Sequence, residues 1–141
     1  MSVKESRGVR NRNPGNIEYA PNNHWQGQLK PDFSIEKRFA RFDTPENGIR
    51  ALARVLLSYQ RKHGLKTVKA IISRWAPSVE NDTAAYVRAI ESSTGTRPGA
   101  EIELDQPAVM AGFVKAIIHH ENAGYVYPDR IVAEGVRRAL A

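Results

Sequence analysis

Near its N-terminus the chain reads Arg10-Asn11-Arg12-Asn13-Pro14-Gly15-Asn16-Ile17. Three asparagines around a Pro-Gly pair predict a tight turn, because proline fixes its own φ, glycine tolerates positive φ, and asparagine side chains bond to nearby backbone. An asparagine amide also carries both donors and an acceptor, so it can hold a polar ligand such as a sugar. Two interpretations therefore stay open for this stretch, a capped surface turn and a substrate-contacting loop.

The length and composition of the chain indicate an ordinary globular domain. With 141 residues and 41% hydrophobic content, we expect residues 1–141 to form a single domain, with residues 1–9 as a flexible arm. No apolar run reaches the roughly 18 residues that a membrane span needs, and the first residues lack the apolar stretch of a secretory signal. The absence of cysteine excludes disulfides and thiolate metal sites.

The charge balance points to a polyanionic partner. Twenty-one Lys and Arg residues against fifteen acids give a net charge of +6 and an isoelectric point near 9.8. Nucleic acid, an anionic membrane face and an acidic cell wall all fit such a charge. The basic residues are scattered and no nucleic-acid-binding motif is present, so we expect affinity for an anionic cell-envelope surface and no specific nucleic acid.

The first part of the chain predicts a small β element. Phe33-Ser34-Ile35 and Arg38–Phe42 alternate apolar and polar residues, which is typical of half-buried strands. Two shorter extended pieces precede them, at 17–19 and 25–28. We therefore expect residues 15–42 to form an irregular antiparallel sheet or long hairpin.

From Thr44 onward the pattern becomes helical. Thr44-Pro45-Glu46 is a typical helix start, and Gly64 is a typical stop. Further helices are predicted over 67–75, from 82 or 83 to the residue before Gly95, from 105–107 to about 121, and from 129 to 140. The predicted fold class is thus α+β, helix-dominated, with about five helices after the N-terminal hairpin or sheet.

Most kinds of catalytic chemistry find no support in the residues. There is no Gly-x-Ser-x-Gly motif and no phosphate-binding glycine loop. The adjacent His119 and His120 would point about 100° apart on a helix, so with His24 and Glu121 they make a poor metal site. We expect no metal and no cofactor.

Carboxylates remain, because cleavage of a glycosidic bond needs a protonatable acid. Glu121 is the leading candidate. It ends a strongly apolar predicted helix, where the helix dipole disfavours a negative charge and so favours the protonated acid. The alternatives are Glu80, Glu46 and Glu18. Glu46 and Glu80 lie where they can stabilise helix N-termini, Glu18 can simply be solvated on the hairpin, and Glu121 itself can be an exposed residue of a frayed last turn.

Several segments together resemble a family of small phage and prophage proteins that are often labelled virion structural or lysis-associated. The resemblance rests on Arg7–Ile17, Trp25-Gln26-Gly27, Phe39–Phe42, Thr44–Ala51, Ile71–Pro77, and Glu80-Asn81-Asp82-Thr83 with Tyr86. It covers nearly the whole chain and implies a phage protein connected with the virion or with lysis.

A second resemblance concerns mechanism. Lysozyme-like and glucosaminidase-like folds place a catalytic Glu at a helix end, followed by an Asn-rich opening, a hairpin and a helical bundle. Here the unit resembling that helix and Glu, Ile117–Asn122, lies at the other end of the chain. This implies a lysozyme-like domain in circularly permuted order, with Glu121 beside the turn Asn13–Asn16. The substrate contacts that it implies are Asn13, Asn16, Trp25, Gln26, Asn81, Thr83, Tyr86 and Asn122.

The function predicted from these features is a phage-type peptidoglycan hydrolase that cleaves the glycan strand with a Glu general acid. We expect a monomeric, muramidase-like or lytic-transglycosylase-like endolysin, held in the virion or in the host cytoplasm before release and acting on the wall in the periplasm. The alternatives are a non-catalytic virion structural or assembly protein with a lysozyme-like shell, and a basic nucleic-acid-binding protein.

Overall fold

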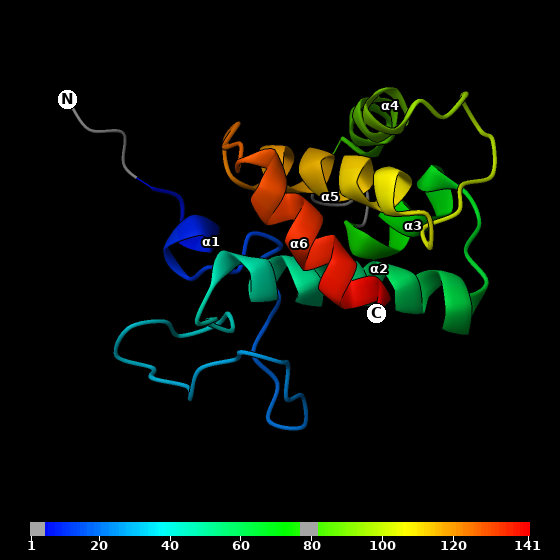
Figure 1. Cartoon of the computed structure of the whole chain (residues 1–141). Coiled ribbons are helices and arrows are strands. Elements are labelled where there is room, and N and C mark those ends of the chain that lie inside the picture. Colours follow the sequence, from blue (N-terminus) through cyan, green and yellow to red (C-terminus); the bar gives the residue numbers. More distant parts are fainter. Residues whose placement is uncertain (1–4, 77–81) are drawn as a thin grey trace.

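The computed structural model describes residues 5–76 and 82–141, and Figure 1 shows two parts in them. One part is a group of packed helices, and the other is a set of loops beside α2, which we call the loop layer and define as residues 11–43. The helices are α1 (Arg7–Arg10), α2 (Pro45–His63), α3 (Val68–Trp75), α4 (Thr83–Thr94), α5 (Pro107–Glu121) and α6 (Asp129–Leu140).

Helix α2 begins and ends where the sequence predicts. The Thr44 side chain accepts a hydrogen bond from the Asn47 backbone N–H, and Pro45 occupies the first turn. Gly64 ends the helix with a φ of 64°, the left-handed conformation that glycine tolerates best. The helices predicted over 67–75, 83–94, 107–121 and 129–140 are confirmed as α3 to α6.

The helices enclose an apolar core. Helices α2 and α6 approach closely, because Gly135 presents no side chain to Ile49; a Cβ at that glycine would lie 2.5 Å from Ile49 Cγ2. Large side chains that are fully buried come from four of the helices and from the connection between α4 and α5: Ile49, Leu52, Leu56, Ile71, Ile72, Tyr86, Ile90, Leu104, Met110, Phe113 and Ile117. Burial of this apolar surface is the main source of stability for the helical part.

The predicted hairpin at 15–42 is present only as two isolated antiparallel bridges within the described residues, Glu18 with Phe39 and Gln28 with Phe42. The physical reason lies in the residues around the two bridges. Pro21 and Pro31 cannot donate to a strand ladder, and Gly27 has a φ of 78°, so regular pairing stops after one or two residues. Alternation of residue types in this segment reflects partial burial, not continuous strands.

The N-terminal arm differs from the prediction for its described part. Residues 7–10 form the single turn α1, whose N-cap Ser6 accepts a hydrogen bond from the Val9 backbone N–H. Gly8 and Val9 are buried. A four-residue helix has little stability of its own, so it is held by the contacts its neighbours make with the rest of the domain. Residues 1–4 lie outside the described part.

The helix-dominated fold class is confirmed, with six helices in the described residues and very little strand. The additional helix is α1. In residues 5–76 and 82–141 we find no helix with the length and apolar character needed to cross a bilayer.

Candidate functional site

A cleft of about 520 Å³ opens where the N-terminal turn, the loop layer and three helices meet. Its volume falls in the range of small-ligand sites. The turn supplies the first wall, residues 38–39 the second, and the ends of α3 and α5 close it together with the middle of α2. The lining residues are Gly15, Asn16, Ile17, Glu18, Arg38, Phe39, Val55, Tyr59, Trp75, Ala76 and Glu121.

Glu121 reaches this cleft because it is the last residue of α5. The residues of α5 before it are anchored by buried side chains, including Ile117 and Ile118. Its carboxylate is therefore held at the end of a packed helix, half-buried and next to the Asn-rich turn. The sequence predicted this approach of Glu121 to the turn, and the geometry brings Glu121 and Asn16 into one cleft.

Buried Tyr86 donates a hydrogen bond to the Glu121 carboxylate. Its hydroxyl donates to Glu121 Oε1 over 3.3 Å, and its ring stacks on His120 with the ring centroids 3.8 Å apart. Burial, and then the neighbouring Glu121 carboxylate, raise the pKa of the Tyr86 hydroxyl far above its usual range, while a hydrogen bond from Trp75 opposes the shift. Tyr86 therefore keeps its proton and acts as a donor to Glu121.

Asn13 supports the turn from inside and is fully buried. Its Nδ2 donates to the backbone carbonyls of Ile17 and Ala40, both over 2.9 Å, and its Oδ1 accepts from the Ile17 backbone N–H over 3.0 Å. Both amide donors are thus used by the protein backbone. Asn13 joins the turn to Ala40 at the far end of the loop layer, and it has no accessible group for the sugar contact that the sequence suggested.

Asn16 is the asparagine of the turn that lines the cleft. It adopts a φ of 50°, a left-handed conformation in which asparagine is favoured over most other residues. Its Oδ1 is buried and has no hydrogen-bond partner among the described residues. The close approach of Gly8 explains this orientation, since a Cβ on Gly8 would lie 2.9 Å from that oxygen.

Asn122 follows Glu121 and is buried. Its Nδ2 donates to the carbonyls of Pro14 and Ile118 over 2.8 and 2.9 Å, and its Oδ1 accepts from the Ser6 hydroxyl over 2.7 Å. These bonds fasten the end of α5 to the turn. Asn122 was predicted as a substrate contact; its observed contacts position Glu121 against the turn.

Glu18, an alternative acid in the sequence analysis, also lines the cleft. Its carboxylate pairs with the Arg38 guanidinium, whose Nε lies 2.8 Å from Glu18 Oε1, and both side chains are mostly exposed. Arg38 also lies over the Phe39 ring, 4.9 Å from its centroid. The cleft therefore carries one carboxylate held by a tyrosine and a second one paired with an arginine.

Trp25 and Gln26 lie away from Glu121. Trp25 packs against the small cluster of Ala40, Phe42 and Ala51, and it lines a separate pocket of the loop layer. The Gln26 amide donates to Asn47 at the start of α2 over 3.5 Å. The structure does not bring these two predicted contacts into the cleft.

The remaining predicted residues have varied positions. Glu46 lies in the first turn of α2, as expected of a residue that stabilises a helix N-terminus, and it does not line the cleft. Thr83 begins α4. Glu80 and Asn81 lie outside the described residues.

Aromatic residues of the cleft are the part that the sequence analysis missed. Tyr59 of α2 lines the cleft with Arg74 above its ring, 5.2 Å from the centroid. Trp75 stands at the end of α3, and Phe39 comes from the loop layer. A tryptophan placed just before a helix stop is a usable signal, since such positions border loops.

Among the described residues no group of three or more His, Asp or Glu side chains is arranged to hold a metal ion. The fold and cleft define a small helical protein with an open polar cleft, which is lined by three aromatic side chains and by a carboxylate that accepts a hydrogen bond from a buried tyrosine.

No family model matches the chain. Protein P5 of Pseudoalteromonas phage PM2 is 37% identical to it over 131 residues, which cover 92% of this chain and 79% of the phage protein. Identity of this extent shows common descent, so the chain belongs to the family of this phage protein. The relative's name states no activity.

Proposed function

We propose that this protein is a peptidoglycan hydrolase of phage type that cuts the glycan strand, with Glu121 as general acid. The observation that carries the proposal is the position of Glu121, at the end of α5, in a cleft with Asn16 and three aromatic side chains. Membership of a phage protein family and a net charge of +6, which suits an anionic wall, agree with it.

The lining of the cleft suits a sugar chain. Trp75 offers an aromatic surface to the C–H faces of pyranose rings, and Asn16 and Arg38 offer hydrogen bonds to hydroxyl, acetamido and carboxylate groups. Phe39 and Tyr59 add aromatic rings over which Arg38 and Arg74 lie. A volume of about 520 Å³ accommodates more than one ring. This mixture of aromatic and polar surfaces is what a strand of N-acetylated sugars requires.

Glu121 would act by donating its proton to the glycosidic oxygen as the bond from that oxygen to the anomeric carbon breaks. Tyr86 occupies Glu121 Oε1, so Oε2 is the oxygen that a substrate would meet. The resulting carboxylate then takes a proton from the attacking water, or from a hydroxyl of the same sugar if the product is an anhydro sugar. Glu18 is paired with Arg38, which favours a mechanism with one acid.

The order of elements is compatible with a circularly permuted lysozyme-like domain. In such a domain the helix ending at Glu121 takes the place of the first helix, and the turn at 13–16 follows the acid in space although it precedes it in the chain. The bonds that Asn122 donates to the Pro14 carbonyl and accepts from the Ser6 hydroxyl supply the connection in space that the chain does not. This assignment of the fold is part of the proposal.

The test is zymography and turbidity loss with purified peptidoglycan and with outer-membrane-permeabilised Gram-negative cells. We expect Glu121→Gln to lower activity by about 10²–10⁴-fold, because the proton donor is lost while the shape is kept. Its melting temperature should stay close to that of the wild type. Glu103→Gln, an exposed substitution outside the cleft, serves as the matched control and should keep full activity.

Three further variants decide between the acids. Glu18→Gln, Glu46→Gln and Glu80→Gln change the alternatives that the sequence offered, and loss of activity in any of them with Glu121→Gln still active would reject Glu121 as the acid. Wild-type protein that clears no peptidoglycan would reject the enzyme and favour the virion structural alternative. Mass spectrometry of the released fragments separates hydrolysis from anhydro-sugar formation, since the products differ by one water.

A further inference from the structure

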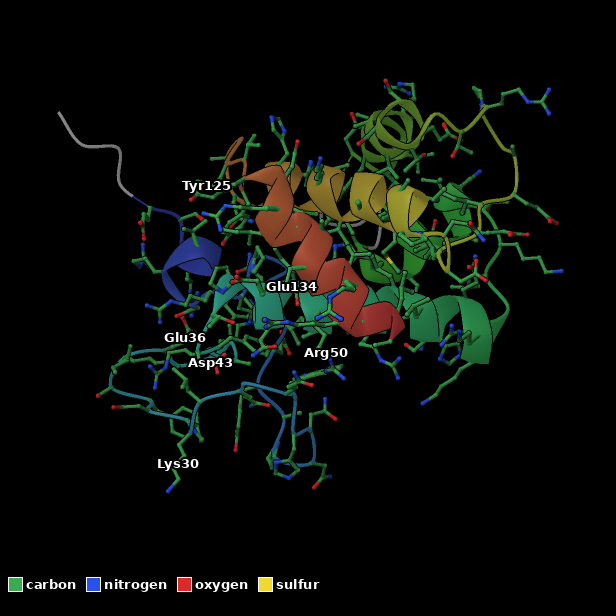
Figure 2. The ribbon with its side chains drawn as sticks, viewed as in Figure 1. Lys30, Glu36, Asp43, Arg50, Tyr125 and Glu134 are labelled. Carbon is green, nitrogen blue, oxygen red and sulfur yellow. The ribbon has the colours of Figure 1, made fainter. Side chains whose placement is uncertain are left out.

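The loop at 30–37 displays apolar side chains at the outer edge of the loop layer. Phe33 is 54% exposed and Ile35 is 64% exposed, although such residues are usually buried. Among the described residues the other large hydrophobic side chains with comparable exposure are Tyr125 and Val126, on the connection between α5 and α6. Figure 2 shows Lys30 pointing away from the helices at one end of the molecule, with Tyr125 on the opposite side.

The loop is built to hold this conformation. Asp32 accepts hydrogen bonds from the Ser34 backbone N–H and hydroxyl, and its carbonyl accepts from the N–H groups of Ile35 and Glu36. The Tyr19 ring meets the Phe33 ring edge-on, with centroids 5.8 Å apart. Phe33 and Ile35 are therefore presented by a structured turn and not by a loose chain.

The base of the loop is anchored by Glu36, which is buried. Its carboxylate accepts two hydrogen bonds from the Arg7 guanidinium, one from the Asn11 amide, and one each from the backbone N–H groups of Arg38 and Phe39. Figure 2 places Glu36 beside α1. This anchor neutralises the Glu36 carboxylate with Arg7, so the exposed acid that remains in the loop is Asp32, whose carboxylate accepts from Ser34.

Basic side chains flank the apolar tip. Lys30 precedes it and Lys37 follows it, and both are exposed, whereas the neighbouring Arg38 is paired with Glu18. Arg41 donates to the Lys30 carbonyl over 3.2 Å and so holds that end of the loop. Two protruding apolar side chains between long cationic ones match the boundary of an anionic bilayer, in which the apolar groups enter the acyl region and the cations meet phosphates.

We propose that the loop at 30–37 is a peripheral membrane-contact site that inserts Phe33 and Ile35 into the surface of a bilayer containing anionic phospholipid. A bilayer fits better than a protein partner because a stable protein interface needs about 800 Å² from each side, far more than two side chains supply. Lipid insertion requires only that such side chains leave water. The proposal does not depend on peptidoglycan hydrolysis.

The experiment is co-sedimentation of the full chain with vesicles of phosphatidylcholine, with and without phosphatidylglycerol. We expect the wild type to bind the anionic vesicles, and Phe33→Ser with Ile35→Ser to weaken binding by about tenfold for each side chain. Lys30→Glu with Lys37→Glu should also weaken it. The matched control is Val126→Ser, which removes an apolar side chain of similar exposure elsewhere and should bind as the wild type does.

The outcomes are separable. Equal binding by the wild type and the Phe33/Ile35 double variant would overturn the insertion of the loop, and no binding by the wild type would overturn the site altogether. Equal binding to neutral and anionic vesicles would overturn the role of the lysines. Peptidoglycan hydrolysis measured in parallel without vesicles should be the same for the double variant and the wild type, so failure of one proposal is distinguishable from failure of the other.

Discussion

The helical part and the loop layer are stabilised by different forces. The helices share an apolar core of fully buried side chains. The loop layer is joined to α1 by the buried Glu36 carboxylate and to α5 by the buried Asn122 amide, while the buried amides of Asn11 and Asn13 bond within the layer. Apolar burial is non-directional and tolerates small shifts, but a hydrogen bond depends steeply on distance and angle. The cleft lies where the two parts meet, so the core positions Glu121 and the polar network positions the turn opposite it.

The largest effect is expected in the core. Phe113→Ala removes a ring that is completely buried and should lower the free energy of unfolding by about 3–5 kcal/mol. Chemical denaturation followed by circular dichroism measures this. Phe33→Ala, in a residue that is 54% exposed, should change the stability by less than about 0.5 kcal/mol. Similar losses for the two variants would contradict the described core.

Asn13→Ala tests the other part of the comparison, the polar network of the loop layer. It leaves the Ala40 carbonyl and the Ile17 N–H without their partner and removes one of the two donors to the Ile17 carbonyl, which keeps the Ala40 N–H, so we expect a loss of about 2–4 kcal/mol. Hydrogen exchange should show faster exchange in residues 11–43 with the helices still protected. Asn23→Ala, an exposed asparagine in the same layer, is the control and should behave as the wild type.

Glu36→Gln weakens the same network in a pH-dependent way. Arg7 and the other donors hold the pKa of Glu36 well below its usual range, so the carboxylate stabilises the fold above the ordinary carboxyl pKa of about 4.3, and that stability is lost as the pH falls. At neutral pH the variant should lose about 2 kcal/mol, because charged hydrogen bonds are replaced by weaker ones.

The difference between wild type and Glu36→Gln should shrink as the pH is lowered from 5 through about 4.3 and below, because the unfolded wild-type chain then takes up a proton at Glu36 that the folded chain does not. Urea denaturation across this range is the measurement. A difference that stays constant with pH would mean that Glu36 acts through shape alone. Glu18→Gln, at an exposed ion pair, is the control and should show little change at any pH.

The smallest effect on stability is expected beside the cleft, where the helical part and the loop layer meet. Tyr86→Phe keeps the ring and its stacking on His120 but removes the donor to Glu121. We expect a stability change of about 1 kcal/mol or less and, under the proposed function, a severalfold loss of activity. A loss as large as that of Glu121→Gln would indicate that Tyr86 touches the substrate.

Much of the helical part was predictable because local signals agree with the final fold. Thr44 with Pro45 at one end and Gly64 at the other marks α2, and the apolar periodicity of 107–121 marks α5. The hairpin was not predictable in detail, since its alternation is interrupted by Pro21, Pro31 and the positive φ of Gly27. Periodicity reports burial and does not specify which residues pair.

The candidate site was predictable in part. The sequence singled out Glu121 and the turn at 13–16 as partners, and the cleft contains Glu121 and Asn16. The sequence could not show that the side-chain amides of Asn13 and Asn122 bond to backbone groups, or that Trp25 lies in another pocket. An asparagine amide binds a carbonyl or a sugar equally well, so its role depends on which groups the fold brings to it.

By itself the sequence determined the approximate boundaries of α2 to α6, the net positive charge, the absence of cysteine chemistry and the position of an acid at a helix end. These properties depend on neighbouring residues or on composition alone. Only the tertiary structure decided which asparagines support the turn, that Tyr59 and Trp75 line the cleft, and that Tyr86 holds Glu121. These depend on contacts between residues far apart in the chain, such as the bond from Asn122 to Pro14, which no local pattern encodes.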